Sequence, residues 1–100
     1  MTDTTKTKTI EMPCLHMNGT SYRMLAEGYD NAHDAVRNAL KALGQIEFNA
    51  RDYYVKEGSW SRAVTQMDER KRKLCEVFYE LEAIMEHLYD ENQRLNPSRS

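Results

Sequence analysis

The chain has 100 residues, of which 40% are hydrophobic and 30% are charged, and its formal net charge at pH 7 is −2. A chain of this length forms at most one domain with a small core, so support from an oligomer is expected. The slightly acidic balance excludes the broad positive field of strongly basic DNA-coating proteins, so no long nucleic acid is expected as a partner. No apolar run approaches the about 18 residues of a membrane span, and no signal-peptide pattern is present, which predicts a cytoplasmic protein without membrane contact.

The two cysteines, Cys14 and Cys75, are far apart and show no CxxC spacing, which predicts free thiols. Cys14 and His16, with His33 and His87 elsewhere, are residue types that bind zinc, but their spacing is not that of paired-ligand zinc motifs. We therefore expect no metal and no cofactor. Instead, Cys14 is expected to pack and His16 to hydrogen-bond the adjacent turn.

The two ends of the chain are expected to be flexible tails, at residues 1–9 and 96–100, flanking a single domain over residues 10–95. Residues 1–9 contain no apolar residue after the initiator methionine, so burial cannot offset the entropy of ordering them. The segment that follows is apolar, but Pro13 forbids a helix interior or central strand there. This predicts an extended N-terminal arm that packs across a neighbouring helix or a partner subunit.

A first helix is predicted at about 21–43. The Asn18-Gly19 pair favours a turn, and the hydroxyl of Thr20 or Ser21 can cap the amides that follow. Gly44 is expected to take the left-handed conformation that commonly ends a helix. The apolar residues recur at heptad spacing and form a predicted seam of Tyr22, Leu25, Tyr29, Ala32, Val36, Ala39 and Leu43.

A second helix is predicted at about 59–91, with Gly58-Ser59 offering an N-cap and Asn96-Pro97 ending any helix. Lys71 interrupts its seam, and Val77 and Ile84 add a flanking apolar row. The seam residues are Trp60, Val64, Met67, Leu74, Phe78, Leu81, Met85 and Leu88.

These elements predict an all-α fold: an antiparallel helical hairpin with an extended N-terminal arm, assembled into an oligomeric helix bundle. Each helix has more apolar surface than one facing seam uses, so we expect homo-oligomerisation through the second helix. The residues expected at that contact are Leu74, Val77, Leu81, Ile84 and Leu88.

The loop between the helices is longer than the usual two to eight residues and carries three aromatic residues and an arginine. Either its aromatic side chains pack back onto the helices, or they form a surface for a planar or anionic ligand. Phe48 and Trp60 are expected to plug the end of the hairpin. For Arg51-Asp52-Tyr53-Tyr54, the two alternatives are a ligand-binding loop and a structural clasp.

Three groups of residues are candidates for binding an anionic ligand. The turn before the first helix offers free amides and hydroxyls, the loop offers a guanidinium beside aromatic rings, and one turn of the second helix is strongly basic. The alternatives are that the turn only caps the helix, that the loop residues only pack, and that the basic turn is a solvated charged face. The two ends of a hairpin lie apart, so the turn and the loop can meet only across subunits. The candidate residues are Asn18, Thr20, Ser21, Arg51, Tyr53, Tyr54, Arg70 and Lys73.

Two segments, His16-Met17-Asn18-Gly19-Thr20-Ser21 and Asn49-Ala50-Arg51-Asp52-Tyr53-Tyr54, resemble the HLNGTS and N-G/A-RDYY segments of a family of small helical proteins of tailed bacteriophages. The resemblance covers roughly residues 15–90. The chain departs from that pattern at Met17, where leucine is usual. It also reads Val55-Lys56-Glu57-Gly58 where a Pro-Gln-Gly loop commonly follows the tyrosines.

The resemblance implies a phage protein that acts in the host bacterial cytoplasm. Its architecture is similar to that of phage sponge proteins, which implies an oligomeric anti-defence protein that sequesters a cyclic nucleotide or related immune signal without cleaving it. The alternative is a phage module that inhibits or adapts a host or phage protein by direct contact, through the acidic surface of the second helix. No carboxylate pair, catalytic triad or metal set stands out, so an enzyme is not expected.

Overall fold

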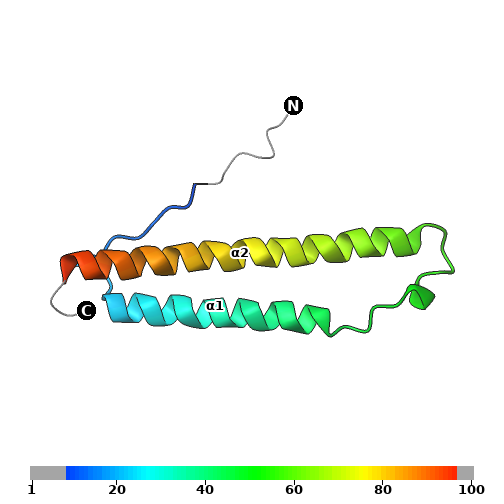
Figure 1. The fold of residues 1–100 in the computed structure, drawn as a ribbon, viewed down its shortest axis with the longest axis horizontal. Helices are drawn as coiled ribbons and strands as arrows, with labels where there is room; N and C mark the ends of the chain where they lie inside the picture. The colour runs from blue at the N-terminus through cyan, green and yellow to red at the C-terminus, as the bar shows by residue number, and fades with distance from the viewer. Residues whose placement is uncertain (1–8, 97–100) are drawn as a thin grey trace, which may run out of the picture.

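The chain folds into two long antiparallel helices that lie side by side, shown in a computed structural model that describes residues 9–96 (Figure 1). Helix α1 spans Tyr22–Gly44, a short 3-10 helix η1 spans Ala50–Asp52, and α2 spans Ser59–Leu95. Within residues 9–96 there is no strand, which confirms the predicted all-α helical hairpin. The tails predicted at 1–9 and 96–100 lie outside the described residues, except for Thr9 and Asn96.

The molecule is a rod. Its Cα radius of gyration is 19.4 Å, whereas a compact domain of this length has about 13 Å. Neither helix in the described part of the chain is long and apolar enough to cross a membrane.

Helix α1 begins as predicted and ends differently. The Ser21 side chain accepts a hydrogen bond from the Met24 amide at 3.2 Å, so Ser21 is the N-cap. Gly44 is still helical, and Gln45 caps the helix in a right-handed conformation with its amide bonded to the Ala42 carbonyl at 3.0 Å. The left-handed Gly44 was therefore wrongly predicted, because a tightened last turn already satisfies the terminal carbonyl.

The left-handed glycine is instead at the start of α2. Gly58 has a φ of 75° and is the N-cap residue, while Ser59 is the first helical residue and gives no side-chain cap. The predicted N-cap at Ser59 is therefore wrong. The glycine is needed there because L-residues rarely adopt this conformation. A Cβ on Gly58 would also lie 2.9 Å from Nη1 of Arg62.

The seam of α1 has the predicted heptad spacing but contains two different residues. Ala32 and Ala39 are exposed, and the positions turned toward α2 are His33 and Leu40. The prediction failed because it considered only apolar residues and so left out His33. The His33 ring stacks on Phe78 with 4.0 Å between ring centroids. Leu25 and Ala26 are both half-buried near the start of the helix, and the rest of the seam consists of Tyr22, Tyr29, His33, Val36, Leu40 and Leu43.

Helix α2 keeps its seam and continues four residues beyond the predicted end at 91. Lys71 is half-buried at a seam position, where its aliphatic stem can pack while the ammonium reaches water. Among the described residues, Met67 and Leu88 are the buried hydrophobic side chains, and Leu88 is 0% exposed. Leu88 was expected at an oligomer contact, and that expectation is wrong because the single hairpin already encloses it.

Residues before α1 contact the back of α2. The Pro13 carbonyl oxygen lies 2.8 Å from Nε2 of His87, and Ile10 lies beside Cys75 and Tyr79. Both cysteines are free, but Cys14 is exposed, so the expected packing of its side chain is wrong. The reason is that the contact to α2 at this point is made by the main chain of the preceding residue.

Candidate functional site

The loop end of the rod is built on three packed aromatic rings. Phe48 lies 4.9 Å from Trp60 and 5.8 Å from Tyr53 between ring centroids, and Tyr53 lies 5.6 Å from Trp60. These separations are within the range of favourable aromatic pairs. The expected plug of Phe48 and Trp60 is confirmed, and Tyr53 belongs to it. We call these three residues the aromatic plug.

Two polar or aromatic groups of the same loop face solvent. Arg51 is exposed in η1, and Tyr54 is 77% exposed. Main-chain bonds hold the short helix beneath them, from the Asp52 amide to Asn49 and from the Tyr53 amide to Ala50. Tyr53 therefore packs as the clasp alternative expects, whereas the side chains of Arg51 and Tyr54 are exposed.

The Asn18–Ser21 turn lies at the other end of the rod. Asn18 and Thr20 are exposed, and Thr20 and Ser21 line an open hollow of about 740 Å³ together with Leu95 and Asn96 from the end of α2. The carbonyl of His16 closes the turn by accepting from the Gly19 amide at 3.1 Å. The turn and the loop of one chain are thus at opposite ends, as the hairpin predicted (Figure 1).

The capping role of Ser21 is open to a direct test. Ser21→Ala removes the acceptor for the Met24 amide, and loss of an N-cap costs about 0.5–2 kcal/mol of stability. We expect a lower midpoint of urea unfolding, with an unchanged slope. Thr20→Ala, one residue earlier and without a capping bond in the described structure, is the matched control and should leave the midpoint nearly unchanged. Equal effects of the two substitutions would contradict this assignment.

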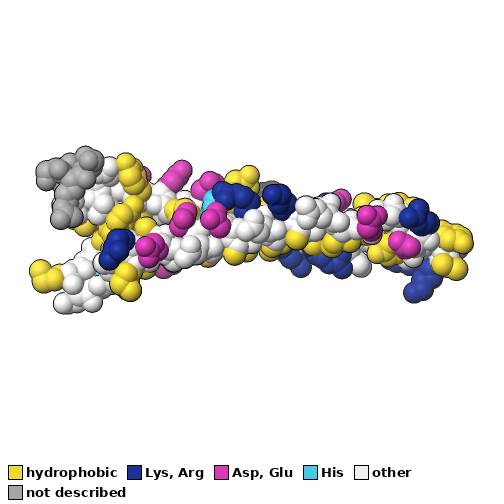
Figure 2. Space-filling view, turned by 90° about the horizontal axis from the view of Figure 1, so that it is seen from below, with side chains coloured by type: hydrophobic (Ala, Val, Ile, Leu, Met, Phe, Trp, Pro, Cys, Tyr) yellow, Lys and Arg dark blue, Asp and Glu magenta, His cyan; other side chains and the backbone are white. Residues whose placement is uncertain are grey.

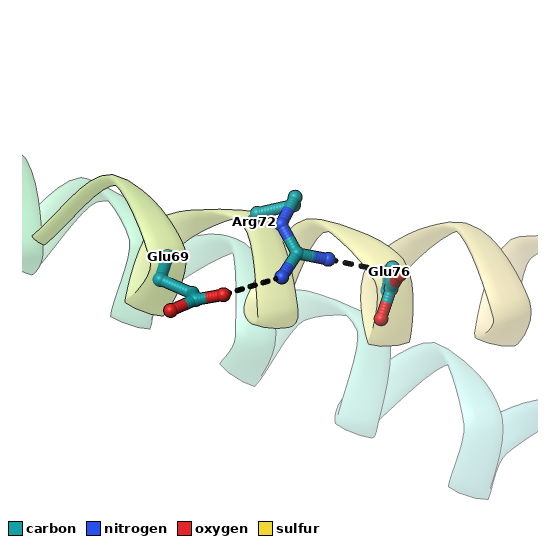
Figure 3. Close-up of polar contacts among 3 residues, drawn as sticks. All are labelled: Glu69, Arg72 and Glu76. Atoms are coloured by element: carbon teal, nitrogen blue, oxygen red, sulfur yellow. Dashed lines mark hydrogen bonds and ion pairs between the residues drawn. The ribbon is translucent and has the colours of Figure 1, made fainter. Parts of the chain in front are cut away.

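The four consecutive basic residues 70–73 of α2 have three different environments. Arg72 lies on the outer surface of α2 between two glutamates, at 3.0 Å from Glu69 and 3.4 Å from Glu76 (Figure 3). Lys71 is in the seam. The predicted pair, Arg70 and Lys73, shares a face and lines an apolar groove of about 580 Å³. The other residues of this groove are Ala39, Ala42, Leu43, Ile46 and Leu74.

A buried histidine in the middle of the rod was missed by the sequence reasoning. His33 is 5% exposed, its Nε2 has no hydrogen-bond partner in the described structure, and Glu82 is 3.8 Å away. The signal was present in the spacing, because residue 33 is four residues after Tyr29 and three before Val36. An unsatisfied buried nitrogen is costly, whereas the ring itself packs favourably in its stack on Phe78.

The candidate residues therefore form three separate groups on one chain. Arg51, Tyr53 and Tyr54 are at the loop, Asn18, Thr20 and Ser21 are at the opposite end, and Arg70 with Lys73 is between them. Within residues 9–96, no three His, Cys, Asp or Glu side chains gather as a metal ion would require. The chain matches no protein-family model, no curated protein and no solved structure.

Proposed function

We propose that this protein is an oligomeric binding protein, not an enzyme, and that it sequesters a nucleotide without cleaving it. The observation that carries the proposal is the loop end, where packed rings support an exposed guanidinium and an exposed phenol ring. Following the bacteriophage resemblance, the ligand would be a cyclic nucleotide or a related immune signal in a host bacterium. The extended N-terminal arm and the homo-oligomer belong to the same proposal.

The chemistry of Arg51 and Tyr54 suits such a ligand. An arginine can hold a phosphate through two parallel hydrogen bonds, which a lysine cannot copy. An aromatic face can stack a base, and base stacking is worth about 1–3 kcal/mol in nucleic-acid complexes. The aromatic plug limits the motion of the loop behind these side chains, which lowers the entropy lost on binding.

Direct contact with a host or phage protein is the second candidate function. It is favoured by the hydrophobic side chains that reach the surface along the rod (Figure 2). Met24, Val77 and Tyr79 are among the exposed hydrophobic residues. Exposed apolar patches on soluble proteins often mark protein contacts. If the protein acts by direct contact, its partner would bind equally well with or without nucleotide. If it sequesters a nucleotide, it would not need a protein partner.

A thermal-shift measurement with a panel of cyclic mononucleotides and dinucleotides tests the nucleotide proposal. A ligand at 100 times its Kd stabilises the folded state by about 2.7 kcal/mol. We expect one class of cyclic nucleotide to raise the Tm of the wild-type protein. Arg51→Ala should abolish this rise while leaving the Tm without ligand nearly unchanged, and Arg51→Lys should restore only part of it.

Arg72→Ala is the control, because Arg72 is also an exposed arginine but lies on the outer surface of α2, away from both the loop and the Asn18–Ser21 turn. It should retain the full ligand-induced rise. If Arg51→Ala unfolds the protein, the loop is a structural clasp and the nucleotide proposal fails. An unchanged Tm with every nucleotide would leave the protein-contact function as the better proposal.

A further inference from the structure

A short segment before α1 lies across α2 (Figure 1). We call residues 10–15, the part of the N-terminal arm that contacts α2, the strap. Its apolar side chains are half-buried, whereas Glu11 and Cys14 between them are exposed. The strap therefore has one side turned toward α2 and one side turned toward water. The half-buried residues are Ile10, Met12, Pro13 and Leu15.

A single side chain of α2 fastens the strap. Nε2 of His87 lies 2.8 Å from the carbonyl oxygen of Pro13. A carbonyl oxygen can only accept, so Nε2 carries the hydrogen and donates it. In the part of the chain that the structure describes, no second hydrogen bond joins residues 9–15 to α2. The polar hold on the strap is therefore concentrated at His87.

Glu91 supports this position of the His87 ring. Its Oε1 lies 3.5 Å from the same Nε2, and its Oε2 lies 3.3 Å from Arg94. The Glu91 side chain is only 15% exposed, so the carboxylate has a defined place one turn beyond His87. A second acceptor beside the Nε2 hydrogen keeps that edge of the ring turned toward the strap.

The core of the hairpin does not include the strap. The buried hydrophobic side chains among residues 9–96, Met67 and Leu88, both belong to α2, and no strap residue is buried. A segment with few buried apolar contacts opens at a much smaller free-energy cost than global unfolding. The strap can therefore leave α2 while the two helices stay packed.

We propose that the strap is a releasable device that opens at His87 while the hairpin stays folded, and that the open form presents Ile10, Met12 and Leu15 to an apolar surface of a protein partner. In the closed form these side chains are half covered. Apolar side chains brought together at a surface are a common basis of protein contacts, and a partner that binds only the open form shifts the equilibrium toward it. The inference thus rests on direct contact as the function.

Distances between two spin labels test the release in the full chain. Cys14 is a free, exposed thiol within the strap. In a Cys75→Ser background, Thr65→Cys adds an exposed site on α2, about 33 Å along the axis from His87 at 1.5 Å per residue. We expect one narrow distance population. His87→Ala should add a broad second one, because losing a typical hydrogen bond raises the ratio of released to fastened strap about 2- to 12-fold.

Two substitutions nearby sharpen this test. His87→Gln keeps an N–H donor and should reverse part of the change. Glu86→Ala is the control, because Glu86 is exposed and lines a different hollow with Met85 and Asp90, and it should keep the narrow population. The helical circular dichroism of His87→Ala should stay close to that of the wild type. A His87→Ala protein that keeps the narrow population, or that loses its helices together with it, would overturn the proposal.

A change in the strap itself tests the release without altering the helices. Ile10→Ser should produce the same second population, whereas Glu11→Ser at the exposed neighbour should not, and equal distances in these two variants would contradict the proposal. The released variants should also bind more of the dye ANS, which reports exposed apolar surface. If the distances broaden without added ANS binding, the strap opens as proposed and only its presentation to a protein partner fails.

Discussion

Leu88→Ala is expected to lower the free energy of unfolding by about 2–5 kcal/mol, the range for buried leucine truncations. Leu88 is 0% exposed. Among residues 9–96, the other buried hydrophobic side chain is that of Met67. A chain with so small a core has few other contacts to absorb the loss, and a small domain has a total stability of only about 5–15 kcal/mol. We therefore expect a partly unfolded protein at 37 °C.

The measurement is urea unfolding followed by helical circular dichroism. Leu95→Ala is the matched control, because it removes the same atoms from the same helix at a position that is 48% exposed. Its effect should be well below that of Leu88→Ala. If the two variants unfold at the same urea concentration, Leu88 does not anchor the hairpin in solution.

Trp60→Ala is expected to have a comparable effect at the loop end, about 3–5 kcal/mol for a large aromatic in a core, reduced here because Trp60 is half-buried. The indole contacts both other members of the aromatic plug, with ring centroids 4.9 Å from Phe48 and 5.6 Å from Tyr53. Its loss removes the packing that holds residues 45–58 against α2. The loop should become mobile before the helices unfold.

Amide hydrogen exchange can locate this effect. In Trp60→Ala, we expect fast exchange in η1 and the first turns of α2, with slow exchange retained near Leu88. Tyr54→Ala is the control, because that ring is 77% exposed and should leave both exchange and Tm nearly unchanged. Fast exchange that spread along the whole of α2 would contradict a local role for the aromatic plug.

The parts of the fold that were predicted correctly from the sequence depend on the regular spacing of residues along one helix. The heptad period of α2 predicted its seam, and Ser21 with Met24 forms the predicted cap. These features depend on residues at most four apart along one helix, so local geometry settles them. The plug of Phe48 and Trp60 was also predicted, because large aromatic rings at the ends of a loop rarely stay in water.

Other features depended on contacts between elements and could not be predicted. His33, rather than Ala32, faces α2 because Phe78 supplies a ring to stack against, a contact between residues far apart in the sequence. The left-handed residue is Gly58 and not the expected Gly44 for a similar reason, since only the path of the loop decides where such a conformation is needed.

The same division applies to the candidate site. The sequence by itself marked Arg51, Tyr53 and Tyr54 as unusual for a loop, because solvated connections seldom carry such side chains. Only the tertiary structure decided that Tyr53 packs on Trp60 while Tyr54 stays exposed. The physical reason is that side-chain exposure depends on the surface a second element presents, and the sequence of one segment does not contain that surface.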